Sequence, residues 1–159
     1  MTKKSQQGTT TVEFAIVAVA FFTILFGVIE IPRAFFVLNA LEEVTRRGAR
    51  IAAVCPINDP AIRNVALFNA TGDGSASVVL PGLSTSDIVV QYLGADGSAI
   101  GNPNGNFIDI RYVRVSIANT YRTELAIPFA NAFFDAPPFS TTLPRESLGV
   151  PRDGVITPC

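Results

Sequence analysis

The sequence predicts an α+β protein in which one long N-terminal helix packs on a small antiparallel β-sheet domain. The first observation is an uncharged apolar run from Phe14 to Ile29, which continues into a charged segment with helical periodicity. The second is a change after Ser77 to short β-prone segments separated by Gly-rich and Asn-rich turns. With 159 residues, of which 48% are apolar and 16% charged, the chain has room for one modest domain beside a membrane segment.

The apolar run is expected to anchor the chain in a membrane. Strictly counted it is 16 residues long, shorter than the roughly 20 that span a bilayer. We therefore expect the span to cover residues about 12–33, with Glu30 and Arg33 forming an i,i+3 ion pair near the interface. No small-residue cleavage pattern follows the run near residue 30, which argues against a removed signal peptide. Both lysines, Lys3 and Lys4, precede the run and place the N-terminus in the cytoplasm.

The helix is expected to continue beyond the span, over residues 9–54, until Pro56 ends it. Pro32 should kink it near Val28, because proline lacks the amide donor. Two ion pairs are expected at i,i+4 spacing, Glu42 with Arg46 and Glu43 with Arg47. The expected inward stripe is Phe35, Leu38, Leu41, Thr45, Ala49 and Ala52.

Residues 55–159 are expected to form the extracytoplasmic α+β domain. Asp59 and Pro60 read as the N-cap and first residue of a short helix that extends to Asn69. The expected strands are Ser77–Leu80, Asp87–Leu93, Phe107–Ala118 and Phe139–Leu143.

Two features of this domain are harder to assign. The apolar alternation slips by one residue between Tyr112 and Val113, which predicts a β-bulge there. The segment Tyr121–Phe134 fits either a short amphipathic helix interrupted at Pro128 or an irregular apolar stretch.

The two cysteines, Cys55 and Cys159, both lie on the predicted extracytoplasmic side, where thiols can oxidise. Closing a loop of about 100 residues would stabilise the fold by roughly 4.7 kcal/mol in the chain-entropy model. Two unpaired thiols are the alternative.

The composition argues against an enzyme. The chain has no histidine and only two distant cysteines, which excludes histidine catalysis and a His/Cys metal cluster. Both lysines precede the span, and no phosphate-binding glycine-lysine motif occurs. We expect no cofactor and no metal, and a net charge of −1 gives no reason to expect nucleic-acid binding.

Glu13 is the most informative single residue, because a carboxylate beside a membrane-length apolar run is costly unless it is paired. One interpretation is an interfacial acid that the helix dipole stabilises by roughly 0.3–1 kcal/mol. The other begins with cleavage after Gly8. That cut would create an α-amine at Thr9, one turn away, which Glu13 of the same or a neighbouring subunit could neutralise and so fix axial register.

The stretch Gly8-Thr9-Thr10-Thr11-Val12-Glu13-Phe14 resembles the processing motif of type IV pilin-like proteins. More narrowly, Phe26–Glu30, Arg46–Arg50 and Thr142–Gly149 resemble the TadE-like proteins of the tight-adherence (Tad) pilus. The resemblance implies a pilin-like fold with a leader over residues 1–8, cut between Gly8 and Thr9, and assembly roles for Glu13 and Phe14. It implies a minor pilin or pseudopilin that helps to assemble or prime a Tad-type (type IVc) pilus for adhesion.

The implied partners are a prepilin peptidase, the major pilin, other minor pilins, and an inner-membrane assembly platform with its ATPase. The implied location is the inner membrane in a single pass with a periplasmic C-terminal domain, and the pilus after assembly. Two alternatives remain open. One is a minor pseudopilin of a type II secretion system. The other is a permanently anchored single-span protein whose β domain binds a ligand, which predicts no processing at Gly8.

Overall fold

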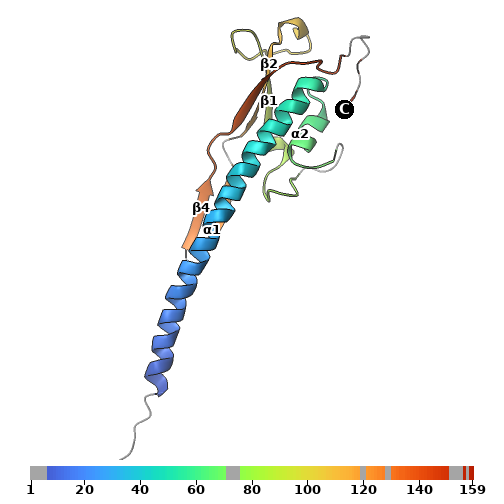
Figure 1. Cartoon of the computed structure of the whole chain (residues 1–159). Coiled ribbons are helices and arrows are strands. Elements are labelled where there is room, and N and C mark those ends of the chain that lie inside the picture. The colour runs from blue at the N-terminus through green and yellow to red at the C-terminus, as the bar shows by residue number, and fades with distance from the viewer. Residues whose placement is uncertain (1–6, 71–75, 119–120, 128–129, 151–155, 157) are drawn as a thin grey trace, which may run out of the picture. The chain divides into compact units, whose positions relative to one another are not determined.

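The computed structural model describes residues 7–70, 76–118, 121–127, 130–150, 156 and 158–159. It confirms the α+β class: a long N-terminal apolar helix continues into a small antiparallel sheet domain (Figure 1). The chain divides into two compact units. The anchor unit contains the helix up to Phe36 together with Glu124–Phe134, and the body contains Val37–Thr123 together with Asp135–Cys159.

Helix α1 covers Gln7–Val54, a length of 48 residues. It begins close to the predicted start and ends at the predicted residue. The helix continues through Pro32 without interruption. The kink expected near Val28 stays a prediction.

The second half of α1 forms one wall of the body's core. Leu41, Ala49 and Ala52 of the predicted stripe are fully buried, whereas Phe35 at its start is exposed. Val44, which was not in the predicted stripe, is also fully buried. Small side chains let the sheet approach this helix closely. A Cβ on Gly48 would lie 3.0 Å from the Val115 Cγ1 atom and 3.2 Å from the Ala66 Cβ atom.

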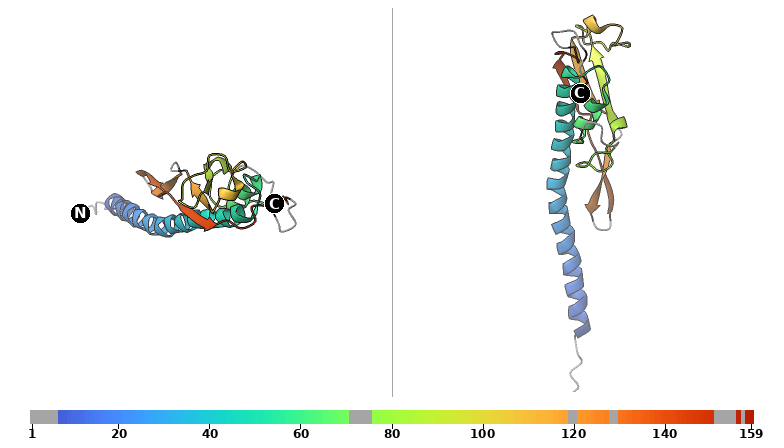
Figure 2. Two further views of the ribbon diagram at one scale, coloured as in Figure 1. Left: turned by 90° about the horizontal axis from the view of Figure 1, so that it is seen from above. Right: turned by 90° about the vertical axis from the view of Figure 1, so that its right-hand side faces the viewer.

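The core sheet has three antiparallel strands in the order β1-β2-β5. They are β1 (Ile88–Leu93), β2 (Tyr112–Ile117) and β5 (Ser140–Pro144), close to three of the predicted strands. Val115 of the central strand pairs with Val90 on one side and Thr141 on the other. Short helix α2 (Pro60–Ala66) begins as predicted, with the Asp59 carboxylate accepting from the Ala61 amide at 2.8 Å. Figure 2 shows α2 and the sheet beside the second half of α1.

Two predictions about strands are wrong. Ser77–Leu80 forms no strand, because the Ser77 hydroxyl oxygen accepts the amides of Val79 and Leu80 and so folds the segment into a turn. The predicted bulge between Tyr112 and Val113 is also absent, since β2 keeps a regular register with β1 on both sides of that point. The apolar pattern slips because residues 107–109 form a 3₁₀ turn instead of strand.

The segment Tyr121–Phe134 is neither a helix nor irregular, so both alternatives for it are wrong. It contains β3 (Arg122–Ile127) and β4 (Ala130–Asp135), which pair as a separate two-stranded sheet. Pro128, at which the helix was expected to break, lies outside the described residues. A proline between two apolar runs is equally compatible with a turn between strands.

Candidate functional site

The residues of the predicted processing and assembly motif lie on the first two turns of α1. Gly8, Thr9, Glu13 and Phe14 are all exposed, with Phe14 at 74%. Within the described part of the chain, no cation pairs with the Glu13 carboxylate. The motif is therefore displayed at the surface of the folded chain, where another protein or a lipid headgroup can reach it.

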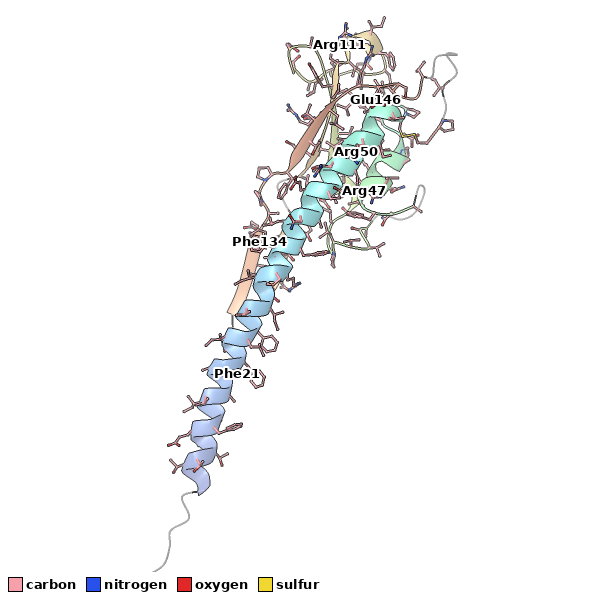
Figure 3. The ribbon with its side chains drawn as sticks, viewed as in Figure 1. Phe21, Arg47, Arg50, Arg111, Phe134 and Glu146 are labelled. Atoms are coloured by element: carbon pink, nitrogen blue, oxygen red, sulfur yellow. A yellow bond between two sulfur atoms is a disulfide. The ribbon has the colours of Figure 1, made fainter. Side chains whose placement is uncertain are left out.

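Behind this motif, the apolar run is almost entirely uncovered by the chain itself. Its exposed large side chains are Ile16, Val17, Val19, Phe21, Phe22, Ile24, Leu25, Phe26, Val28 and Ile29. Figure 3 marks Phe21 on this stretch. The helix is long and apolar enough to cross a membrane. A contiguous apolar surface of this extent does not remain in water, so lipid or other protein chains must cover it.

A buried acid marks the upper end of the run. Glu30 is only 8% exposed and forms the predicted i,i+3 ion pair with Arg33 at 3.1 Å. Arg33 itself is half exposed. Glu13 and Glu30 are 17 residues apart, about 26 Å along a helix axis. This separation is close to the roughly 30 Å thickness of a bilayer's hydrocarbon core, so the two acids mark the ends of a membrane-length segment.

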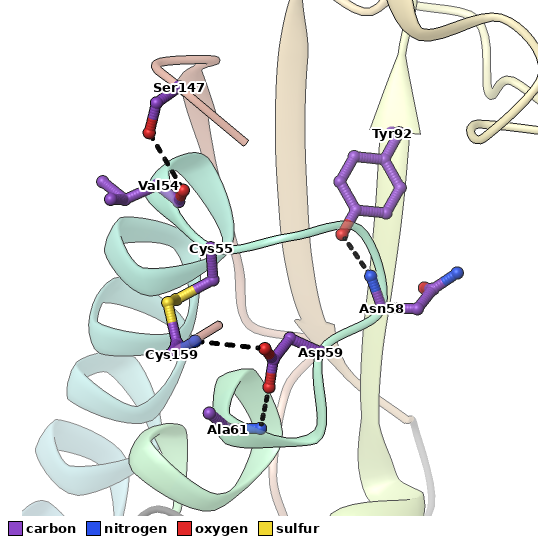
Figure 4. The surroundings of a disulfide bond; sticks show 8 residues. All are labelled: Val54, Cys55, Asn58, Asp59, Ala61, Tyr92, Ser147 and Cys159. Carbon is purple, nitrogen blue, oxygen red and sulfur yellow. Dashed lines mark hydrogen bonds between the residues drawn. A yellow bond between two sulfur atoms is a disulfide. The ribbon is translucent and has the colours of Figure 1, made fainter. Parts of the chain in front are cut away.

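The C-terminal end of α1 is closed by a segment from much later in the chain. The amides of Glu146 and Leu148 donate to the Ala53 carbonyl at 3.0 and 3.3 Å. The Ser147 hydroxyl donates to the Val54 carbonyl at 3.0 Å (Figure 4). These donors satisfy carbonyls that the helix end leaves without intrahelical partners. Sequence reasoning noticed the stretch Thr142–Gly149 only as a resemblance and missed this capping role.

A disulfide joins Cys55, one residue after α1, to Cys159, with the Cα atoms 5.8 Å apart (Figure 4). The Cys159 amide donates to the Asp59 carboxylate at 3.4 Å, the same carboxylate that caps α2. Nearby, the Tyr92 hydroxyl accepts from the Asn58 amide at 3.0 Å. Burial raises the pKa of Tyr92. The segment after α1 is thus fixed to α2, to the sheet and to the C-terminal residue.

One of the two ion pairs predicted on the second half of α1 forms, and the other does not. Glu42 and Arg46 lie 3.9 Å apart, as expected. The predicted pair of Glu43 with Arg47 is wrong, because the Arg47 guanidinium lies 4.6 Å from the centre of the Phe68 ring. A cation over an aromatic face keeps its favourable charge interaction while its stem packs against apolar surface.

Among the described residues, no three His, Cys, Asp or Glu side chains gather where they could hold a metal ion.

Comparison with known proteins agrees with the resemblance seen in the sequence. Residues 8–50 match the family model described as TadE-like protein. This match covers the motif at Gly8, the apolar run and most of the helix that packs on the body. The comparisons with curated proteins and with solved structures found no match.

Proposed function

We propose that this chain is a minor pilin of the tight-adherence type, held in the inner membrane by the first half of α1 until it joins a pilus. The proposal rests on two features that occupy the same part of the chain. The region that matches TadE-like proteins begins at Gly8 and contains an apolar surface that the chain leaves uncovered. A permanent anchor needs such a surface for lipid, and an assembling subunit needs it first for lipid and then for its neighbours.

In this proposal a prepilin peptidase cuts between Gly8 and Thr9, and the new amine at Thr9 is neutralised by a Glu13 carboxylate. The absence of an intrachain ion pair at Glu13 among the described residues supports this role, because the carboxylate is free to accept a partner. Phe14 then packs against neighbouring helices. The body remains in the periplasm, and the major pilin, other minor pilins and the assembly platform with its ATPase act as partners.

Proteolytic cleavage after Gly8 distinguishes a minor pilin from a permanently anchored binding protein, which would keep its leader. Mass spectrometry of the membrane-extracted protein should find an N-terminus at Thr9 in cells with a prepilin peptidase and an intact leader in cells without it. Gly8→Ala should block the cut. Gly27→Ala is the matched control, since Gly27 lies on the same helix with open space around its Cα, and it should be processed normally.

An intact leader in both backgrounds would overturn the proposal in favour of the anchored binding protein. If processing occurs, Glu13→Gln should abolish assembly in a pilus assay while leaving the cut in place. Glu42→Gln, which removes a more distant exposed acid of the same helix, should leave both intact.

A further inference from the structure

The β3–β4 hairpin belongs to two units at once. Its base residues Arg122, Thr123 and Asp135 group with the body, whereas Glu124–Phe134 group with the helix up to Phe36. The part in the anchor unit is uncharged from Leu125 to Phe134 and contains three phenylalanines. An uncharged stretch with three phenylalanines is unusual for a segment that is exposed to water.

Within the anchor unit, the loss of exposure on the helix is greatest at Glu30. It is the one buried residue among the described residues of the helix up to Phe36. Glu30 is 8% exposed, while Ile29 and Ile31 on either side are 54% and 58% exposed. The hairpin is the other element of this unit, so we assign the cover over Glu30 to it.

The position of Glu30 indicates where along α1 the hairpin lies. Glu30 lies at the end of the apolar run opposite Glu13, about 26 Å away along the axis. If the run spans the membrane, Glu30 and Arg33 lie at its outer boundary. The hairpin that covers Glu30 therefore lies at the same boundary.

An exposed ion pair joins the two strands at the base of the hairpin. The Arg122 Nε atom lies 2.6 Å from one Asp135 carboxylate oxygen, and its Nη2 atom lies 3.1 Å from the other. The hydrogen bond from Arg122 lowers the pKa of Asp135. The hairpin is thus charged at Arg122, Glu124 and Asp135 and uncharged over Leu125–Phe134.

We propose that the β3–β4 hairpin is a second membrane-contacting element, whose β4 residues Phe133 and Phe134 lie in the boundary between headgroups and acyl chains of the outer leaflet beside α1. This inference rests on the proposed membrane span of α1. The lipid surface is the favoured partner because Phe133 of the hairpin is 51% exposed and the hairpin groups with the exposed apolar half of α1.

The backbone of the hairpin limits how deep it can lie. A two-stranded sheet has two outer edges whose backbone amides and carbonyls are unpaired, and such groups are not tolerated in the hydrocarbon centre. The boundary region still contains water to satisfy them. A shallow position of about 5–10 Å is that of other interfacial amphipathic segments.

The chain contains no tryptophan, so single substitutions can report the depth of three sites. The full chain would be reconstituted in phosphatidylcholine vesicles whose acyl chains carry bromine either near the headgroup or near the bilayer centre. F133W probes the hairpin, where Phe133 is 51% exposed, and F21W probes the span, where Phe21 is 59% exposed. I108W is the control in the body, where Ile108 is 78% exposed.

The expected result is quenching of F133W about twofold by the shallow bromine and less by the deep one, as for a shallow interfacial segment. F21W should be quenched most by the deep bromine, and I108W by neither. Quenching of F21W without quenching of F133W would overturn the hairpin proposal while leaving the span intact. Loss of quenching at F21W would overturn the span itself. Blue-shifted but unquenched F133W emission would assign the hairpin to a protein surface and overturn the lipid assignment.

Discussion

The two halves of helix α1 have opposite relations to the rest of the chain. In the first half most of the large side chains are exposed, with Phe14 74% and Phe21 59% exposed. In the second half the buried positions are small or aliphatic, such as Ala49 and Ala52 at 0% exposure, and they pack on the sheet. One continuous helix thus combines a half that depends on its surroundings with a half that is stabilised by its own domain.

The two halves differ in side-chain size as well as in charge, since the run from Phe14 to Ile29 is uncharged. Large Phe and Ile side chains present much surface to lipid or to neighbouring helices. Glycine and alanine in the second half allow the sheet to come within van der Waals contact, as at Gly48 beside Val115.

Removing the disulfide should give the largest change in the second half and none in the first. We expect Cys159→Ser to lower the free energy of unfolding of the body by about 3–5 kcal/mol, because the unfolded chain regains the entropy of a long loop. The three tyrosines, Tyr92, Tyr112 and Tyr121, all lie in the body. Their fluorescence during denaturant unfolding of the full chain in detergent micelles therefore reports the body alone.

A double variant tests whether the free Cys55 thiol that Cys159→Ser leaves behind contributes to the loss of stability. The double variant C55S/C159S should unfold at the same denaturant concentration as the single one. An unchanged midpoint in both would show that the bridge contributes nothing to the body's stability.

A pair of truncations on the same helix compares the two halves directly. Leu41→Ala, at a fully buried position, should destabilise the body by about 2–5 kcal/mol through lost contacts and the cavity left behind. Phe21→Ala removes a larger side chain from an exposed position and should leave the tyrosine unfolding curve unchanged. Equal effects of the two substitutions would contradict the division of α1 into two halves.

Substitution of Gly149, in the segment that closes the C-terminal end of α1, should have a smaller effect on the stability of the body. This residue has φ +77°, and a Cβ there would lie 2.5 Å from the Pro56 Cγ atom. We expect Gly149→Ala to destabilise the body by about 2–3 kcal/mol through backbone strain and this clash. Gly97→Ala, with φ +79° but open space, should cost only about 1 kcal/mol of backbone strain. Similar costs in the same tyrosine assay would show that contact with Pro56 is unimportant.

The elements that the sequence predicted well are those with a single strong local signal. Helix α1 has periodicity and a terminal proline, α2 has the Asp59-Pro60 start, and strands β1 and β5 lie between turn residues. The β3–β4 hairpin was missed because its apolar residues do not alternate with polar ones. A strand pattern needs one polar face, and this segment has none over Leu125–Phe134.

The candidate site was predicted only as far as one chain can define it. The positions of Gly8 and Glu13 at the start of an exposed apolar helix follow from local sequence. The closing of α1 by Glu146–Gly149 could not be predicted, because it depends on a contact between segments over 90 residues apart.

The bridge between Cys55 and Cys159 also decides how the protein responds to a mechanical pull. All strands of both sheets lie between these two cysteines. A force applied between helix α1 and Cys159 therefore passes through the sulfur–sulfur bond and bypasses the intervening chain. The 104-residue separation would otherwise release about 350 Å of contour length at roughly 3.4 Å per residue. The disulfide prevents the release of this length, so the body stays folded under loads that would unfold a sheet without the bridge.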